Sequence, residues 1–105
     1  MILYNVTCHL SHAMLSEWLQ WMEQEHIPEV MATGCFTSCR MMKVLTQASD
    51  DEGVNIAIQY SAESMADYER YRDTYAPALQ QKTRERYGEQ VLAYRSLLEV
   101  LADIS

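Results

Sequence analysis

Apolar and polar residues alternate over residues 2–10. The even positions are apolar or aromatic, whereas the odd positions include Asn5, Thr7 and His9. A two-residue period is typical of a β-strand that buries one of its faces. The sequence therefore predicts a first strand over residues 2–10, with its even positions directed to a core.

The period becomes that of a helix after Ser11, a residue type that can cap a helix start. Large side chains then recur on one helical face: Leu15, Trp18, Leu19, Met22 and His26. This spacing predicts one stripe packed against a core. Pro28 disfavours helical backbone at Ile27, so we expect the helix to break there. A brief continuation to Thr33 should end at Gly34.

Residues 35–46 are rich in apolar and β-branched side chains and predict a second strand. Residues 54–60 alternate, with apolar or aromatic side chains at the even positions, and predict a third strand. The cluster at 49–53 is typical of a turn, so these two strands should form a hairpin.

Ser64, followed by Asp67, is typical of the start of a second helix. That helix should restart at Pro77 and end at about Tyr87. Its stripe consists of Met65, Tyr68, Tyr71 and Tyr75. Residues 91–100 predict a fourth strand, with Leu92, Tyr94, Leu98 and Val100 on one side and Val91, Ala93, Arg95 and Leu97 on the other.

The predicted element order is β-α-β-β-α-β within one domain over residues 1–105. At this length the order favours an α+β fold with ferredoxin-like βαββαβ topology. Two right-handed crossovers place both helices on one face of an antiparallel four-stranded sheet.

The sheet face without helices should also carry apolar side chains. Such a face is typical of an interaction surface, so we expect a homodimer that pairs through it. The residues expected at this dimer interface are Leu3, Asn5, Ala57, Gln59, Arg95 and Leu97. Asn5, Gln59 and Arg95 could form a polar cluster inside this interface or at its rim, and the simpler account is interface hydrogen bonding.

The chain resembles an uncharacterised bacterial family, a domain of unknown function, over nearly its whole length. The segments that carry this resemblance are 2–7, 17–34, 59–60, 63–65, 67–71, 75–79 and 95–100. Through His26, Pro28 and Gly34 it also resembles the dimeric α/β-barrel superfamily. This second resemblance implies two ferredoxin-like subunits paired through their sheets. The superfamily includes cofactor-free monooxygenases, small isomerases and cyclases, haem-degrading proteins and members without known activity, so it selects no function.

The charge balance disfavours two classes of partner. Eight basic residues stand against fifteen acidic ones, for a formal net charge of -7. Such a protein is repelled by nucleic acid and by anionic membrane surfaces. The first residues lack the basic and apolar regions of a signal peptide, and no apolar run reaches membrane-spanning length, so we expect a cytoplasmic protein. Its three cysteines should be free thiols in a reducing compartment.

His26 is the candidate catalytic residue. The end of the predicted helix and the neighbouring acidic residues Glu23, Glu25 and Glu29 should favour the charged imidazolium. This group would suit proton donation or anion binding. The alternative is a structural role, in which His26 caps carbonyls left open at the break before Pro28.

Several aromatic and sulfur-containing side chains could line a ligand cleft between helices and sheet. They are Trp18, Trp21, Met22, Tyr60, Tyr68 and Tyr71. The alternative is that they form the core. His9 and His12 do not share a helical face, and no ligand set for a metal is apparent. The sequence contains no phosphate-binding loop, nucleophile elbow or redox motif, so we expect no cofactor.

Three functions fit these observations. The protein could bind a small apolar or aromatic metabolite as a homodimer. It could instead be a cofactor-independent enzyme of the monooxygenase, isomerase or cyclase type that uses His26 for proton transfer. Thirdly, it could be a structural or regulatory dimer without ligand. A cavity of about 300 Å³ or more beside His26 would keep the first two open, and a filled cleft would leave the third.

Overall fold

The computed structural model describes residues 1–46 and 53–105, and it has the predicted element order. The strands are β1 (Ile2–Leu10), β2 (Ser38–Lys43), β3 (Val54–Ala62) and β4 (Leu92–Glu99). The helices are α1 (Leu15–Trp21), α2 (Ile27–Met31), α3 (Met65–Arg70) and α4 (Ala76–Tyr87). Short helical segments join them: η1 (His12–Met14), η2 (Met22–His26), η3 (Tyr71–Tyr75) and η4 (Gly88–Gln90).

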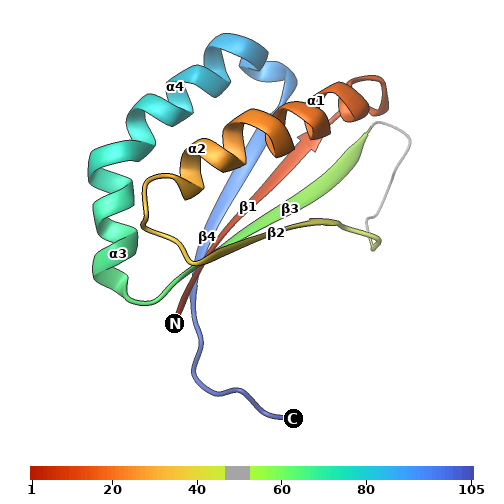
Figure 1. Cartoon of the computed structure of the whole chain (residues 1–105). Helices are drawn as coiled ribbons and strands as arrows, with labels where there is room; N and C mark the ends of the chain where they lie inside the picture. The colour runs from red at the N-terminus through yellow and green to blue at the C-terminus, as the bar shows by residue number, and fades with distance from the viewer. Residues whose placement is uncertain (47–52) are drawn as a thin grey trace.

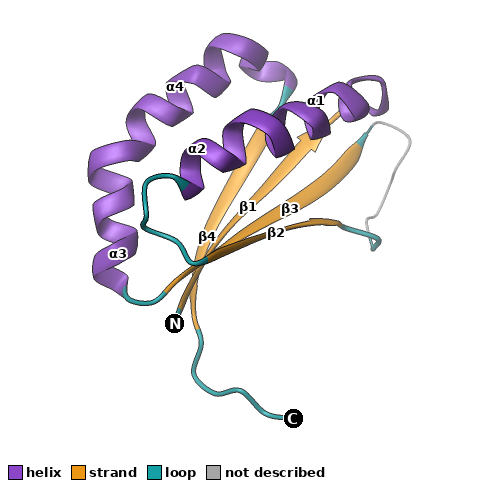
Figure 2. Ribbon diagram, in the orientation of Figure 1, coloured by secondary structure: helices purple, strands orange, loops and turns teal. Residues whose placement is uncertain are grey.

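The four strands form one antiparallel sheet in the order β2-β3-β1-β4. Figure 1 shows that all helices lie on the same side of this sheet, and Figure 2 shows the resulting two layers. The predicted α+β ferredoxin-like fold is therefore confirmed. The turn expected between β2 and β3 lies almost entirely in residues 47–52, outside the described residues, although the two strands pair as expected.

The core lies between the helices and the even positions of β1 and β3. Ile2, Tyr4, Cys8 and Leu10 are buried on β1, and the even positions 54–60 are buried on β3. The alternation in the sequence predicts this face correctly because one side of each strand meets the helices and the other does not. Cys8 and Cys35 are buried, Cys39 is half-buried, and all three thiols are free.

The register of β4 differs from the prediction. Arg95 is paired with Val6 and Leu97 with Tyr4, so both side chains lie on the face that the helices cover. Asn5 is paired with Gln59, and these two share the opposite face. Arg95 therefore cannot join Asn5 and Gln59 in one polar cluster. The prediction that Arg95 and Leu97 lie on the open face is wrong. The open face of β4 instead carries Leu92, Tyr94, Ser96 and Leu98.

The predicted helix break at Pro28 is also wrong. His26 and Ile27 have helical backbone angles, and the chain passes from α1 through the π-helical turn η2 into α2. The N–H of Ile27 donates to the carbonyl of Met22, five residues earlier. Because a π-turn is wider than an α-turn, it accommodates a proline, which has no N–H and whose ring crowds the preceding turn.

The second helical segment also has a π-helical turn shortly before its proline. The N–H of Ala76 donates to the carbonyl of Tyr71 across η3, and Pro77 follows immediately. Each helical segment thus contains a π-turn directly before its X-Pro pair. The widened turns let both helices continue over the sheet and keep their apolar faces in contact with it.

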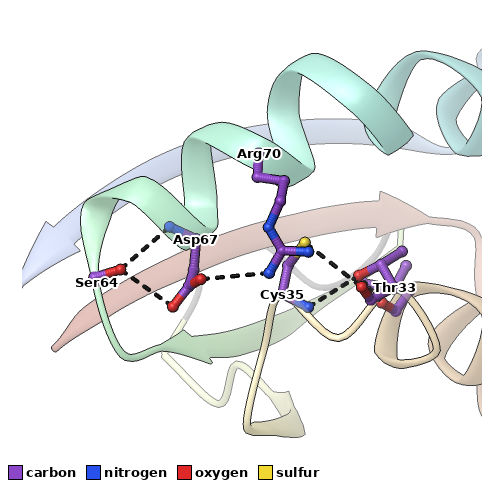
Figure 3. Close-up of polar contacts among 6 residues, drawn as sticks. Thr33, Cys35, Ser64, Asp67 and Arg70 are labelled. Atoms are coloured by element: carbon purple, nitrogen blue, oxygen red, sulfur yellow. Dashed lines mark hydrogen bonds and ion pairs between the residues drawn. The ribbon is translucent and has the colours of Figure 1, made fainter.

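Local hydrogen bonds determine where the helices begin and end. The Ser64 hydroxyl accepts from the N–H of Asp67, which confirms the predicted cap of α3, and Arg70 forms an ion pair with Asp67 (Figure 3). Ser11 makes no such bond, and the 3-10 turn η1 precedes α1. After α2, Gly34 adopts a φ of 76°, the left-handed conformation typical of a helix stop.

Candidate functional site

A small cavity lies between the helical layer and the inner face of the sheet. Its apolar wall consists of Val6, Trp18, Met22, Ile58, Val91 and Ala93. Its polar groups come from Tyr4, His26, Gln80, Thr83 and Arg95, with the hydroxyls of Tyr60 and Tyr71 and the thiol of Cys8. The cavity therefore combines an apolar lining with polar side chains from β1, η2, α4 and β4.

The volume of this cavity is about 70 Å³. This is enough for a few water molecules or a compound of a few heavy atoms. It is smaller than the roughly 300 Å³ expected of a pocket for a drug-sized ligand. The cleft beside His26 is thus neither filled nor large enough, in this conformation, for a bulky metabolite.

His26 contributes a half-buried imidazole from η2 to the cavity. Its ring stacks on that of Trp21, with centroids 5.0 Å apart and planes 23° apart. Among the described residues it has no side-chain hydrogen-bond partner, so its ring nitrogens remain available to a guest.

The predicted preference of His26 for the charged form is wrong. Burial lowers its pKa, and this effect outweighs the negative charge of Glu29. The positive charges of Arg95 and Lys82 lower it further. Moreover, the helix continues through His26, so there is no helix end to favour the cation or to need capping. His26 is therefore neutral at physiological pH, which makes it a proton acceptor.

Arg95 reaches the cavity from the edge strand β4. Its Nε donates a hydrogen bond to the hydroxyl of Tyr4 over 3.1 Å. Tyr4 is only 5% exposed, so this bond holds one side of the guanidinium against the buried wall. Arg95 forms no ion pair with any carboxylate in the described part of the chain. Arg95 is exposed, so water rather than a neighbouring acid solvates its charge.

The other titratable groups of the cavity are kept in their neutral forms by burial. Burial raises the pKa of the hydroxyls of Tyr4, Tyr60 and Tyr71. It also raises the pKa of the Cys8 thiol to about 11. These groups can donate hydrogen bonds but are poor nucleophiles or bases at neutral pH. Of the described cavity residues, His26 is the one suited to proton exchange in that range.

The structure brings most of the predicted ligand-lining residues together. Trp18, Met22, Tyr60 and Tyr71 all line the cavity with His26. Tyr68 instead packs against Tyr4 within an aromatic cluster, with ring centroids 5.2 Å apart. Trp21 does not line the cavity; it is buried beneath the outer helical surface, where its ring contacts Tyr87 and lies under the guanidinium of Arg86.

Sequence reasoning missed Tyr4, Gln80 and Thr83 as cavity residues. Tyr4 stands at an even position of β1, so an inward hydroxyl could have been anticipated from the alternation. Gln80 and Thr83 carry no comparable signal because polar residues on α4 usually face solvent.

A second depression crosses the outer surface between η2, α2 and α4. It is a shallow groove whose floor includes Trp21, Pro28 and Ala32. Two ion pairs, Lys82 with Glu29 and Arg86 with Glu17, link the helices beside it. The groove is open to solvent, and its charged residues Lys82, Glu29 and Arg86 are engaged in these ion pairs, so it is the weaker candidate for a small-molecule site.

Neither a metal site nor a membrane span is found in residues 1–46 and 53–105. No group of three or more His, Cys, Asp or Glu side chains there could hold a metal ion. No helix in these ranges is both long and apolar enough to cross a membrane.

The fold defines the class of this protein, an α+β protein with ferredoxin-like topology. The chain belongs to the family described as Domain of unknown function (DUF4286), whose model matches residues 1–101. This confirms the resemblance to a family of unknown function. No functionally curated protein matches the sequence significantly.

Solved structures show the same fold at low sequence identity. One is a dimeric ferredoxin-like protein from an uncultured marine organism, with a TM-score of 0.75 and 10% identity over 100% of this chain and 99% of that one. A second protein of the same description and origin has a TM-score of 0.66 and 14% identity, with 98% and 97% covered. An ethyl tert-butyl ether d (EthD) family protein from Bacillus halodurans C-125 has a TM-score of 0.66 and 9% identity, with 96% and 100% covered.

Proposed function

We propose that this protein is a homodimer that binds a small molecule in the cavity beside His26. The observation that carries the proposal is the convergence of His26, Thr83 and Arg95, from three different elements, on a cavity whose remaining wall is mainly apolar or aromatic. Small-molecule sites typically combine an apolar lining with a small number of polar groups that orient the ligand. Arg95 is exposed and its Nε is held by Tyr4, so its terminal N–H groups can exchange water for a ligand at this place.

The volume narrows the class of ligand. An engineered apolar cavity of about 150 Å³ holds benzene, whereas this cavity measures about 70 Å³. A compact aliphatic compound therefore fits this conformation better than the aromatic metabolite expected from the sequence. A ring could enter only if a lining side chain changed its rotamer.

Two observations support the homodimer. Two of the similar structures are described as dimeric ferredoxin-like proteins. On this chain, Leu92, Tyr94 and Leu98 lie on the open sheet face and are 47%, 66% and 46% exposed. Exposed apolar side chains at three positions of one sheet face favour association over exposure to water.

A cofactor-independent enzyme is the second candidate function. It is favoured by the neutral imidazole of His26, because a base at the wall of an apolar cavity can accept a proton from a bound acid or carbonyl compound. In this reading Tyr4 and Thr83 orient the ligand by hydrogen bonds. Turnover of a bound compound that disappears in His26→Gln, with binding retained, would distinguish the enzyme from the binding protein.

We expect Ala93→Leu to abolish ligand binding. Ala93 is half-buried at the cavity wall, and the added carbons of leucine occupy a volume similar to the cavity itself. Binding can be followed by NMR with compounds of about four to eight heavy atoms, through the indole N–H signal of Trp18. The wild type should respond to some of these compounds, and the variant to none.

Ala66→Leu is the matched control, because Ala66 is exposed on α3 and remote from the cavity lining. It should bind as the wild type does. If Ala93→Leu folded and still bound the same compounds with the same affinity, the cavity would not be the binding site. A wild type that responds to no compound would contradict the proposed function itself.

A further inference from the structure

We propose that the cavity selects short aliphatic monocarboxylates and that Arg95 binds their carboxylate group. This inference rests on the proposed function, since it names the chemical class that the cavity would accept. Four features carry it: the anchored guanidinium, its missing counter-ion, the apolar wall and the small volume.

The guanidinium of Arg95 is anchored on one side and free on the other. Its Nε donates to the buried hydroxyl of Tyr4 at 3.1 Å, which restricts the side chain and leaves the terminal N–H groups for another acceptor. A guanidinium with parallel free N–H groups matches the geometry of a carboxylate. The hydrogen bond also aims Arg95 at the inner face of the sheet, away from its sequence neighbours Tyr94 and Ser96, which lie on the open face.

The charge of Arg95 is not matched by an acid of this chain. On the helices, Arg70, Arg72, Lys82 and Arg86 each pair with a carboxylate, whereas Arg84 contacts the amide of Gln81. Within the described ranges Arg95 has no such partner, although the protein carries a net charge of -7 and is rich in acids. Its positive charge reaches the interior, because it lowers the pKa of His26 and opposes the rise in the pKa of Tyr4 and Tyr71. Water solvates this exposed guanidinium in the free protein, and a bound carboxylate would replace that water.

The rest of the cavity limits the size and polarity of the group that carries the carboxylate. Val6, Trp18, Ile58 and Ala93 offer apolar surface, which favours an aliphatic body and disfavours a fully hydrated ion such as phosphate. The volume of about 70 Å³ restricts the body to a few carbons. A short branched acid such as isobutyrate combines these properties.

The test compares isobutyrate with isobutyramide, which has nearly the same shape and no charge. Dissociation constants are measured by NMR titration of the wild type, using the Trp18 indole signal. We expect isobutyrate to bind about tenfold or more tightly, the factor typical of one charge-assisted hydrogen-bond pair. Inorganic phosphate at the same concentrations should produce no change at Trp18.

Variants test whether Arg95 causes the preference for isobutyrate over isobutyramide. Arg95→Gln should remove it, so that acid and amide bind alike, and Arg95→Lys should retain a part because it keeps the charge but not the planar fork. Arg84→Gln is the control: it removes the same charge from an exposed position of α4, where Arg84 contacts Gln81 and does not line the cavity. It should behave as the wild type.

The outcomes separate this inference from the proposed function. If isobutyramide or other neutral compounds bind as tightly as isobutyrate, the cavity is a binding site but Arg95 does not select carboxylates. If the preference persists unchanged in Arg95→Gln, another group recognises the acid and the inference is overturned. If neither probe nor any compound of the wider panel perturbs Trp18, the proposed function fails together with the inference.

Discussion

Leu98→Asp should convert the proposed homodimer into monomers, whereas Leu97→Asp should leave it intact. The two leucines are adjacent on β4 and similarly exposed, at 46% and 40%, but they lie on opposite faces of the sheet. Leu98 pairs with Leu3 on the open face and Leu97 with Tyr4 on the helix-covered face. An unpaired carboxylate inside an apolar interface costs several kcal/mol, which weakens dimerisation by a factor of about a hundred or more.

Light scattering at micromolar concentration measures this directly. The wild type and Leu97→Asp should have twice the mass of the monomer, and Leu98→Asp the mass of one chain, with an unchanged circular dichroism spectrum. Dissociation by Leu97→Asp alone would show that the subunits pair through another face. A monomeric wild type would contradict the proposed homodimer.

His26→Gln should make the protein less sensitive to acid. Burial lowers the pKa of His26 in the folded state, whereas the unfolded chain keeps the ordinary value of about 6.5. Above that pH both states are neutral and the group leaves stability unaffected. As the pH falls below it, the unfolded chain binds a proton before the folded protein does, so folding stability is lost. The loss attributable to this group is at most about 1.4 kcal/mol per pH unit.

Denaturant unfolding between pH 8 and pH 5 tests this expectation. At pH 8 the variant should be less stable by about 1 kcal/mol, because the glutamine loses the ring contact with Trp21. Toward pH 5 the difference should shrink or reverse. His12→Gln, which replaces an exposed histidine on η1, is the control. Its stability should fall toward pH 5 as that of the wild type does. If His26→Gln followed the wild type at every pH, His26 would not be the group that resists protonation.

The strand and helix order could be predicted from the sequence because periodicity is a local property. On β1 and β3 one face is apolar and the other mainly polar, so the buried face of each strand follows from the alternation. On β4 both faces carry large apolar side chains, such as Leu97 and Leu98, and alternation cannot choose between them. The hydrogen-bonded register with β1 makes that choice and places Arg95 opposite Val6.

The helix at Pro28 shows a local preference overridden by packing. The residue before a proline disfavours helical backbone, yet Ile27 is helical because the π-turn η2 makes room for the ring. Trp18 and Val30, before and after the turn, are both buried in the core. Their burial favours one continuous helical segment over two separate helices. The stabilisation from this burial cannot be deduced from the pattern of residues in one sequence.

The sequence by itself determined the element order, the inner faces of β1 and β3 and the cap at Ser64, because these depend on spacing along the chain. It also indicated a minority of the cavity residues, among them Trp18, Met22 and His26. The tertiary structure alone decided that Arg95 enters this cavity and that His26 is neutral. The register between strands that are distant in sequence selects the face on which Arg95 lies. Desolvation by the packed helices lowers the pKa of His26, and this effect cannot be deduced from the charges that neighbour His26 in the sequence.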